Sequence, residues 1–160
     1  MTEVLNTVEE CVDRAIAKVG KKLVVMAPLG LGKPVQLINA FYRRAAADPS
    51  LSLHIYTALC LELPPPAKGV EASLSGPIVK RLFGDYEELD FIKPVRQDTL
   101  PANIEVSELY FKAGSMKSIP SAQRHYISSN YTHIVRDMFN AGANVLLQLV
   151  AARETPEGLS

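Results

Sequence analysis

The sequence has no excess of charge of either sign. Lys and Arg together number 17, as do Asp and Glu, so the formal net charge at pH 7 is zero. A chain with this balance has no global basic field to attract nucleic acid or an acidic membrane surface, so neither is expected as a partner. The balance is still compatible with a local anion site.

Long apolar runs and cysteines are also scarce. No apolar run approaches the ~20 residues of a membrane-spanning helix. Glu3, Glu9 and Glu10 interrupt the apolar pattern at the start, which argues against a secretory signal. The two cysteines, Cys11 and Cys60, match no metal-ligand or redox spacing, so no metal or disulfide is expected from them. We expect two reduced, buried thiols in a cytoplasmic protein.

The sequence does have the composition of an ordinary globular domain. Of its 160 residues, 48% are hydrophobic and 21% are charged, which argues against disorder. This length can bury one substantial core. We therefore expect residues 1–160 to form a single α/β domain.

Apolar residues along the chain follow helical and strand periods in turn. The predicted helices cover residues 4–19, 35–47, 75–83 and 126–141. The predicted strands cover residues 22–27, 51–61, 104–111 and 143–151. Residues 90–103 and 114–120 are predicted as loops, and residues 153–160 as a polar tail. This order predicts a mostly parallel sheet with helices on both faces, and its second to fourth elements predict a right-handed βαβ unit.

Two details of this prediction concern element ends. Thr2 is the expected cap of the first helix and Gly20 its stop. From Gly84 to Asn103 about 20 residues carry no predicted element, which is unusual in a compact domain unless the loop serves a site or a partner. The alternative is a short helix that the apolar pattern does not reveal.

A glycine-rich loop between a predicted strand and a predicted helix is the strongest local signal. Its residues are Gly30, Leu31, Gly32, Lys33 and Pro34. Glycines allow a ligand to approach the backbone, the free N–H groups of a helix start favour anions, and the lysine adds positive charge. The spacing matches neither the dinucleotide fingerprint nor the Walker A loop. The loop is therefore either a phosphate or oxyanion site or a tight turn without a ligand.

Other candidate residues are weaker. Glu62 follows the second strand, at the edge where open α/β sheets bind ligands, but a solvated carboxylate is the commoner outcome there. Ser129 and Asn130 could bind a substrate or satisfy the N–H groups of the late helix. His54 lies within a strand, and His133 shares a helix face with Asp137. No catalytic residue is assigned, and no cluster in the sequence has metal-ligand spacing.

Several stretches together resemble the acetyl-CoA hydrolase/transferase family, which includes butyrate- and 4-hydroxybutyrate-type CoA-transferases. They are residues 24–34 with 37–42, residues 53–59, residues 126–137 (Tyr-Ile-Ser-Ser-Asn-Tyr-Thr-His-Ile-Val-Arg-Asp) and residues 144–150. The long match at residues 126–137 is the most specific of them. The likeness covers most of residues 22–151 and corresponds to the amino-terminal half of the family's two related α/β halves.

The resemblance implies an active site between the two halves. In such transferases a glutamate attacks the acyl-CoA thioester, giving first an acyl-glutamyl anhydride and then a glutamyl-CoA thioester. That glutamate belongs to the second half, and no Glu-x-Gly sequence occurs in these 160 residues. The resemblance therefore implies acyl-CoA and a short carboxylate as substrates, no resident cofactor, and a carboxyl-terminal half that either continues the chain or is a separate protein. The loop at residues 30–34, with Ser129 and Asn130, would then face the acyl group.

Alternatives of other classes remain. The chain could be a non-catalytic module of the same fold that binds CoA or another protein, and a homodimer would cover an apolar face left by an open cleft. A relative of sugar-phosphate isomerases would need a local acid–base pair, which the sequence does not offer. The choice between hydrolysis and transfer, and the acyl chain, cannot be read from these residues.

Overall fold

A parallel sheet forms the centre of the protein. The structure is a computed structural model that describes residues 3–151, 154–155 and 158–159. The strands of the sheet are β1 (Lys22–Leu29), β2 (Ser52–Ala58), β3 (Ile104–Glu108) and β4 (Val145–Leu146), in the order β3-β2-β1-β4 and all parallel. The helix between β1 and β2 completes the predicted βαβ unit. The α/β class and the parallel sheet are thus confirmed.

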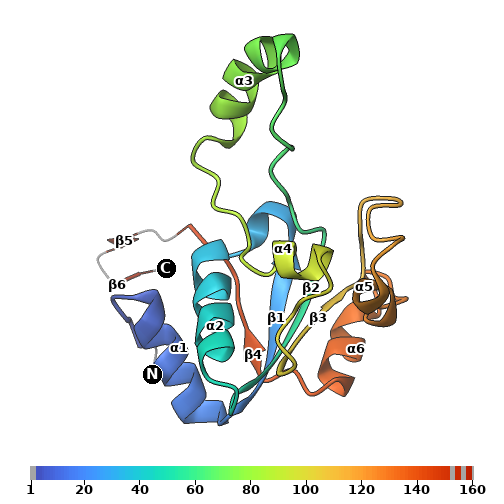
Figure 1. Cartoon of the computed structure of the whole chain (residues 1–160). Helices are drawn as coiled ribbons and strands as arrows, with labels where there is room; N and C mark the ends of the chain where they lie inside the picture. Colours follow the sequence, from blue (N-terminus) through green and yellow to red (C-terminus); the bar gives the residue numbers. More distant parts are fainter. Residues whose placement is uncertain (1–2, 152–153, 156–157, 160) are drawn as a thin grey trace.

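Helices cover both faces of this sheet, as Figure 1 shows. One face carries α1 (Val8–Val19) and α2 (Val35–Ala47), and the other carries α5 (Pro120–Arg124) and α6 (Ile134–Asn140). The remaining helices are α3 (Val70–Phe83), α4 (Ile92–Arg96) and the single 3-10 turn η1 (Gly30–Gly32). Among the described residues, none of these helices combines the length and apolar character that crossing a bilayer requires.

Alternation along the strands divides their side chains between the two faces. Leu23 and Val25 of β1, with Leu53 and Ile55 of β2, face α1 and α2 and belong to the main core. Their neighbours along the strands point to the opposite face, where α6 contributes to a smaller cluster. The buried members of that cluster are Ala58, Leu109, Ile134 and Met138.

The first helix starts later than the sequence analysis predicted. It begins at Val8 because Thr7 provides the cap: its Oγ1 accepts the Glu10 backbone N–H at 3.1 Å, and the Glu10 carboxylate accepts the Thr7 N–H at 3.2 Å. This reciprocal capping box satisfies two of the N–H groups that have no carbonyl partner within a helix beginning at Val8. Thr2, the expected cap, lies outside the described residues. Gly20 ends the helix as predicted.

The predicted loop at residues 90–103 is wrong in part, because it contains α4. Leu89, Phe91, Ile92 and Val95 are all buried in the main core. The helix is only five residues long, too short for its apolar pattern to show a helical period, and Pro94 lies within it. The missed short helix is therefore the alternative that the sequence analysis left open.

Several other predicted boundaries also differ. Strands β2 and β3 end three residues before their predicted ends, and β4 keeps only two of the nine predicted residues. The late helix begins at Ile134 instead of residue 126, because Tyr126 forms a bridge beside Glu108 of β3. The loop predicted at residues 114–120 leads into α5, which the sequence analysis missed. The predicted tail contains the antiparallel pair β5 (Glu154–Thr155) and β6 (Gly158–Leu159).

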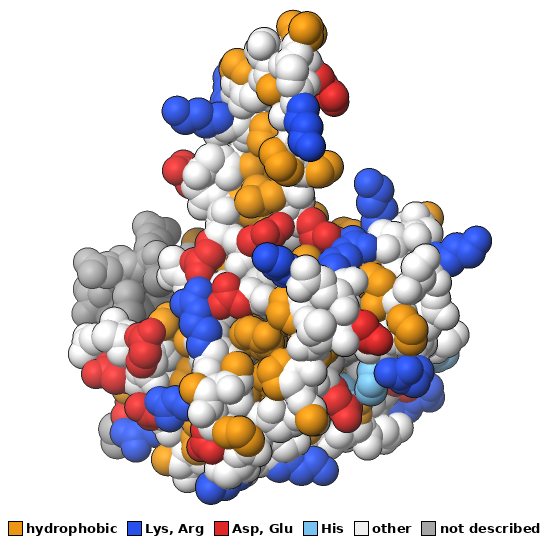
Figure 2. Space-filling model, in the orientation of Figure 1, with side chains coloured by type: hydrophobic (Ala, Val, Ile, Leu, Met, Phe, Trp, Pro, Cys, Tyr) orange, Lys and Arg blue, Asp and Glu red, His pale blue; other side chains and the backbone are white. Residues whose placement is uncertain are grey.

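An arm that carries α3 projects from the carboxyl edge of the sheet (Figure 1). The predicted helix at residues 75–83 is confirmed and extends back to Val70, and none of its residues is buried. Val70, Leu74, Ile78 and Leu82 are spaced by four and all are exposed, so they form one apolar stripe. Figure 2 shows apolar side chains along this arm and charged side chains where it meets the body.

Candidate functional site

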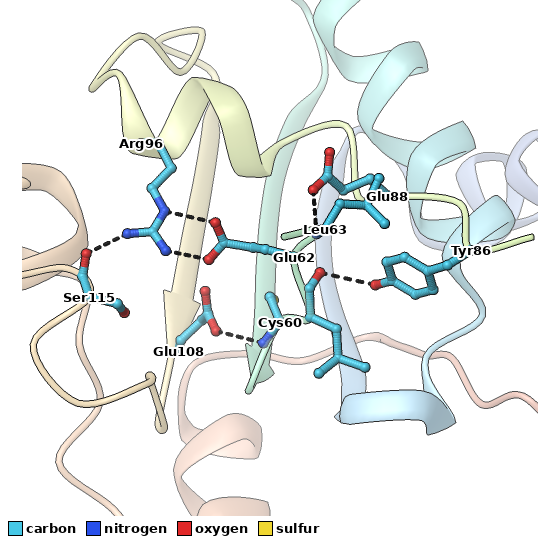
Figure 3. A network of polar contacts seen from close by, with 9 residues as sticks. Cys60, Glu62, Leu63, Tyr86, Glu88, Arg96, Glu108 and Ser115 are labelled. Atoms are coloured by element: carbon cyan, nitrogen blue, oxygen red, sulfur yellow. Dashed lines mark hydrogen bonds and ion pairs between the residues drawn. The ribbon is translucent and has the colours of Figure 1, made fainter. Parts of the chain in front are cut away.

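A cleft lies where β2 and β3 end at the carboxyl edge of the sheet. Its volume is about 840 Å³, and it is lined by residues 59–65 on one side and by Arg96, Tyr110 and residues 112–115 on the other. The first wall is the chain that follows β2, which the three prolines at 64–66 keep out of regular structure. In parallel sheets, the carboxyl ends of strands are where ligands bind. This cleft is therefore the candidate site (Figure 3).

Glu62 is immobilised in this cleft by Arg96. The guanidinium donates from Nε to Glu62 Oε2 at 3.0 Å and from Nη2 to Oε1, which is a bidentate pair, while Nη1 donates to the Ser115 carbonyl. The three groups come from the β2 exit, from α4 and from the loop after β3, so one arginine joins three segments (Figure 3). Glu62 is thus neither freely solvated, as the commoner outcome would have it, nor free to act as a base.

The two limbs of the arm are bonded to each other at its root. Tyr86 Oη donates to the Leu61 carbonyl at 3.0 Å, and the Leu63 N–H donates to Glu88 Oε1 at 2.9 Å. Asn39, fully buried on α2, holds the returning limb: its amide nitrogen donates to the Glu88 carbonyl at 3.0 Å. These bonds fix the wall of the cleft even though α3 itself has no buried residue.

Beneath this wall lies a buried group formed by Lys33, Cys60 and Glu108. Lys33 Nζ donates to the Ala58 carbonyl and, at 3.2 Å, to the Leu59 carbonyl, and Glu108 Oε2 accepts the Cys60 N–H at 3.4 Å. Lys33 and Glu108 are each only 3% exposed. The three residues come from the loop after η1 and from the carboxyl ends of β2 and β3.

Burial shifts the pKa of each member of this group toward its neutral form. It lowers the pKa of Lys33, which Cys60 and Glu108 partly restore, and it raises the pKa of Glu108. Burial and the neighbouring Glu108 raise the pKa of the Cys60 thiol well above its ordinary value. A thiol in that state is a poor nucleophile, because the thiolate is the reactive form. The group therefore favours packing and hydrogen bonding over covalent chemistry by Cys60.

The raised pKa of Glu108 predicts a pH dependence of stability. A folded-state pKa above the unfolded one means that the folded state binds more protons, so the free energy of unfolding falls as pH rises from about 4.5 through the folded pKa. Replacing Glu108 by Gln removes this titration. In urea unfolding from pH 4 upward, the stability of the wild type relative to Glu108→Gln should decline with pH. Parallel pH profiles of the two proteins would contradict the assignment.

The loop at residues 30–34 takes a tighter form than an open phosphate cradle. Gly30 has φ +56°, a left-handed conformation that glycine adopts without strain, and its N–H donates to the Leu59 carbonyl at 3.2 Å. A groove of about 560 Å³ next to the loop also carries the carboxylates Asp85 and Glu87. The charge that Lys33 was expected to add points instead toward the carbonyls at the end of β2. The predicted anion site here therefore has less positive charge than the sequence indicated.

Ser129 and Asn130 lie before α6, not within it. Asn130 Oδ1 accepts the N–H groups of Thr132 at 3.0 Å and His133 at 3.1 Å, and Ser129 Oγ donates to Asp137. They satisfy the helix start and its side chain, the second of the two roles that the sequence left open. Their substrate contact stays a prediction, since neither lines the cleft described above.

Sequence reasoning missed Arg96 and Glu108, the two residues that organise the cleft. Glu62 was selected because it lies at the carboxyl end of a strand, and Glu108 lies at such an end too. The strand was predicted to continue to residue 111, however, so Glu108 was placed inside it. Arg96 could not be found, because α4 was taken as loop.

Comparison of the chain with family models, with curated proteins and with solved structures finds no match.

Proposed function

We propose that this chain is the amino-terminal half of an acyl-CoA:carboxylate CoA-transferase or acetyl-CoA hydrolase, and that its cleft is one wall of the active site. The proposal starts from the resemblance at residues 126–137. The observation that carries it is the open cleft at the carboxyl ends of β2 and β3. A thioester with a short acyl group would lie there between two protein surfaces.

In the proposed reaction the second half supplies the glutamate. Its carboxylate attacks the thioester carbonyl, the C–S bond breaks, and CoA leaves as thiolate. The thiolate then attacks the glutamyl carbonyl of the anhydride and releases the acyl group as a carboxylate. CoA is now bound to the enzyme as a glutamyl-CoA thioester. This chain contributes a rigid wall and backbone N–H donors near the developing oxyanions.

The charged side chains of the cleft are consistent with this supporting role. Glu62 is held by Arg96, and the thiol of Cys60 is kept protonated, so neither competes with the incoming glutamate for the thioester. The exposed apolar side chains at this edge fit the arrival of a second half. They include Leu31, Leu146, Leu149 and Val150 as well as the stripe on α3.

Reconstitution tests the proposal. The chain is mixed with a purified carboxyl-terminal half that carries the glutamate, and exchange of CoA between acetyl-CoA and labelled acetate is followed together with thioester hydrolysis. We expect activity only with both halves. Replacing the glutamate of the second half by alanine is the matched control and should abolish exchange.

The second candidate function is a non-catalytic binding module of the same fold. It is favoured by two features of the cleft: Glu62 is paired with Arg96, and burial raises the pKa of the Cys60 thiol well above its ordinary value. It predicts CoA binding without exchange under all pairings. If the reconstituted pair shows neither CoA exchange nor thioester hydrolysis but still binds CoA in calorimetry, this function would replace the transferase proposal.

A further inference from the structure

A second polar cluster lies near the other end of the strands, on the sheet face covered by α5 and α6. His54 of β2 and Glu105 of β3 are register partners, so their side chains are neighbours on one face. His125 follows α5 and reaches the same place, with its ring edge-on to that of His54 at 6.4 Å between centroids. One ligand atom of each residue lies within 4.8 Å of those of the other two.

We propose that His54, Glu105 and His125 form a binding site for a divalent ion of the zinc class. Two imidazoles and one carboxylate are ligands that zinc prefers, and three protein ligands leave a fourth position for water. Ligand atoms bound tetrahedrally to zinc lie about 3.4 Å apart, given bonds of about 2.0–2.1 Å. His54 Nδ1 and Glu105 Oε2 already lie 3.4 Å apart. Only the distances from the other two ligand atoms to His125, which lie within 4.8 Å, need to close further.

The surroundings of His54 match those of a metal-binding histidine. Its Nε2 lies 2.8 Å from the hydroxyl of Ser107, which is buried on β3. A hydrogen bond from Nε2–H to that hydroxyl leaves the Nδ1 lone pair directed toward Glu105. Such a partner behind the ligating nitrogen is a regular feature of zinc sites. The ring also stacks on Tyr56, with centroids 4.1 Å apart, which restricts its rotation.

The backbone holds His125 beside the strand. The His125 N–H donates to the Ser121 carbonyl at 3.0 Å, and the Ile127 N–H donates to the Glu108 carbonyl at 2.9 Å. The two bonds fix the chain before and after this position against α5 and β3. An ion bound here would therefore join α5 to β2 and β3, and unfolding would require its release.

A charged residue near the site allows the direction of a change in zinc affinity to be predicted. Lys22 of β1 is exposed and lines the same small cavity as His54 and Glu105, so its positive charge acts on the same site. A positive charge weakens the binding of a cation, whereas Glu105 strengthens it. Lys22→Met is therefore expected to tighten zinc binding, and Glu105→Gln to weaken it.

Calorimetry with ZnCl₂, on protein whose affinity tag has been removed, tests the site. We expect one ion per chain and a zinc-dependent rise in the unfolding temperature. Glu105→Gln and His125→Gln should each lose most of the affinity, and Ser107→Ala should lose roughly 10–100-fold. His133→Gln, which changes the remaining histidine of the chain, should bind zinc like the wild type. MgCl₂ should not compete, because magnesium prefers oxygen ligands.

Three results would overturn the proposal. The first is no zinc binding at micromolar concentrations. The second is wild-type binding by Glu105→Gln and His125→Gln, whose exposed or half-buried positions allow the fold to persist. The third is a thiolate-to-metal absorption band in the Co²⁺ form, which would place the ion on Cys11 or Cys60. None of these measurements depends on thioester chemistry, so the outcome is independent of the proposed function.

Discussion

Replacing Phe91 by alanine is expected to lower the free energy of unfolding by about 3–5 kcal/mol, the range for deleting a buried aromatic ring. Phe91 has no exposed surface, and its ring lies 6.4 Å from that of Tyr42, between centroids. It anchors the segment that enters α4, so its loss leaves a cavity between α2 and that helix. Urea unfolding monitored by circular dichroism measures the change.

Phe139→Ala is the matched control for this prediction. Phe139 lies on α6 but is 66% exposed, so the same truncation should change the free energy of unfolding by no more than about 0.5 kcal/mol. Equal losses in the two variants would contradict the burial of Phe91. Phe91→Ala should also reduce the activity of the reconstituted pair, because α4 carries Arg96 to the cleft.

Replacing Lys33 by methionine is expected to cost about 1–3 kcal/mol of stability, because the buried Ala58 carbonyl loses the ammonium donor and the Leu59 carbonyl keeps only the Gly30 N–H. Methionine keeps most of the length and the apolar stem of the side chain, so packing is little changed. The effect should appear without any ligand, in the same unfolding experiment. A side chain that only binds substrate would show no such loss.

Lys112→Met is the control for Lys33. Lys112 lines the cleft above Lys33 and is exposed, so its replacement should leave stability within about 0.5 kcal/mol of the wild type. Unchanged stability of Lys33→Met, together with weaker CoA binding, would contradict the structural role and restore the lysine to the anion site that the sequence predicted.

The elements that sequence analysis placed well are those with long, regular apolar patterns. The βαβ unit was predicted with β1 starting at Lys22 and α2 spanning residues 35–47, because apolar side chains recur there at strand and helix spacing. The parallel sheet follows from that unit and from the apolar character of the strands. Short elements carry too few residues for a period to emerge, which is why α4 and α5 were missed.

The cleft was harder to predict than the sheet because its geometry depends on contacts between distant segments. The pair of Glu62 and Arg96 joins residues 34 positions apart, and the bond from Lys33 to Ala58 joins residues 25 positions apart. Sequence position placed Glu62 at the correct edge, but it could not show that an arginine from α4 would hold it. Likewise, the lysine of a glycine loop normally faces a ligand, and only the fold turns Lys33 inward.

Hydrogen–deuterium exchange on the reconstituted pair, with and without a non-hydrolysable acetyl-CoA analogue, tests most directly whether the carboxyl edge of the sheet is the thioester site. The account predicts new protection at residues 29–34 and 59–65, with little change around His54 and Glu105 at the opposite end. Protection confined to that opposite end, or absent while the analogue is bound, would contradict it.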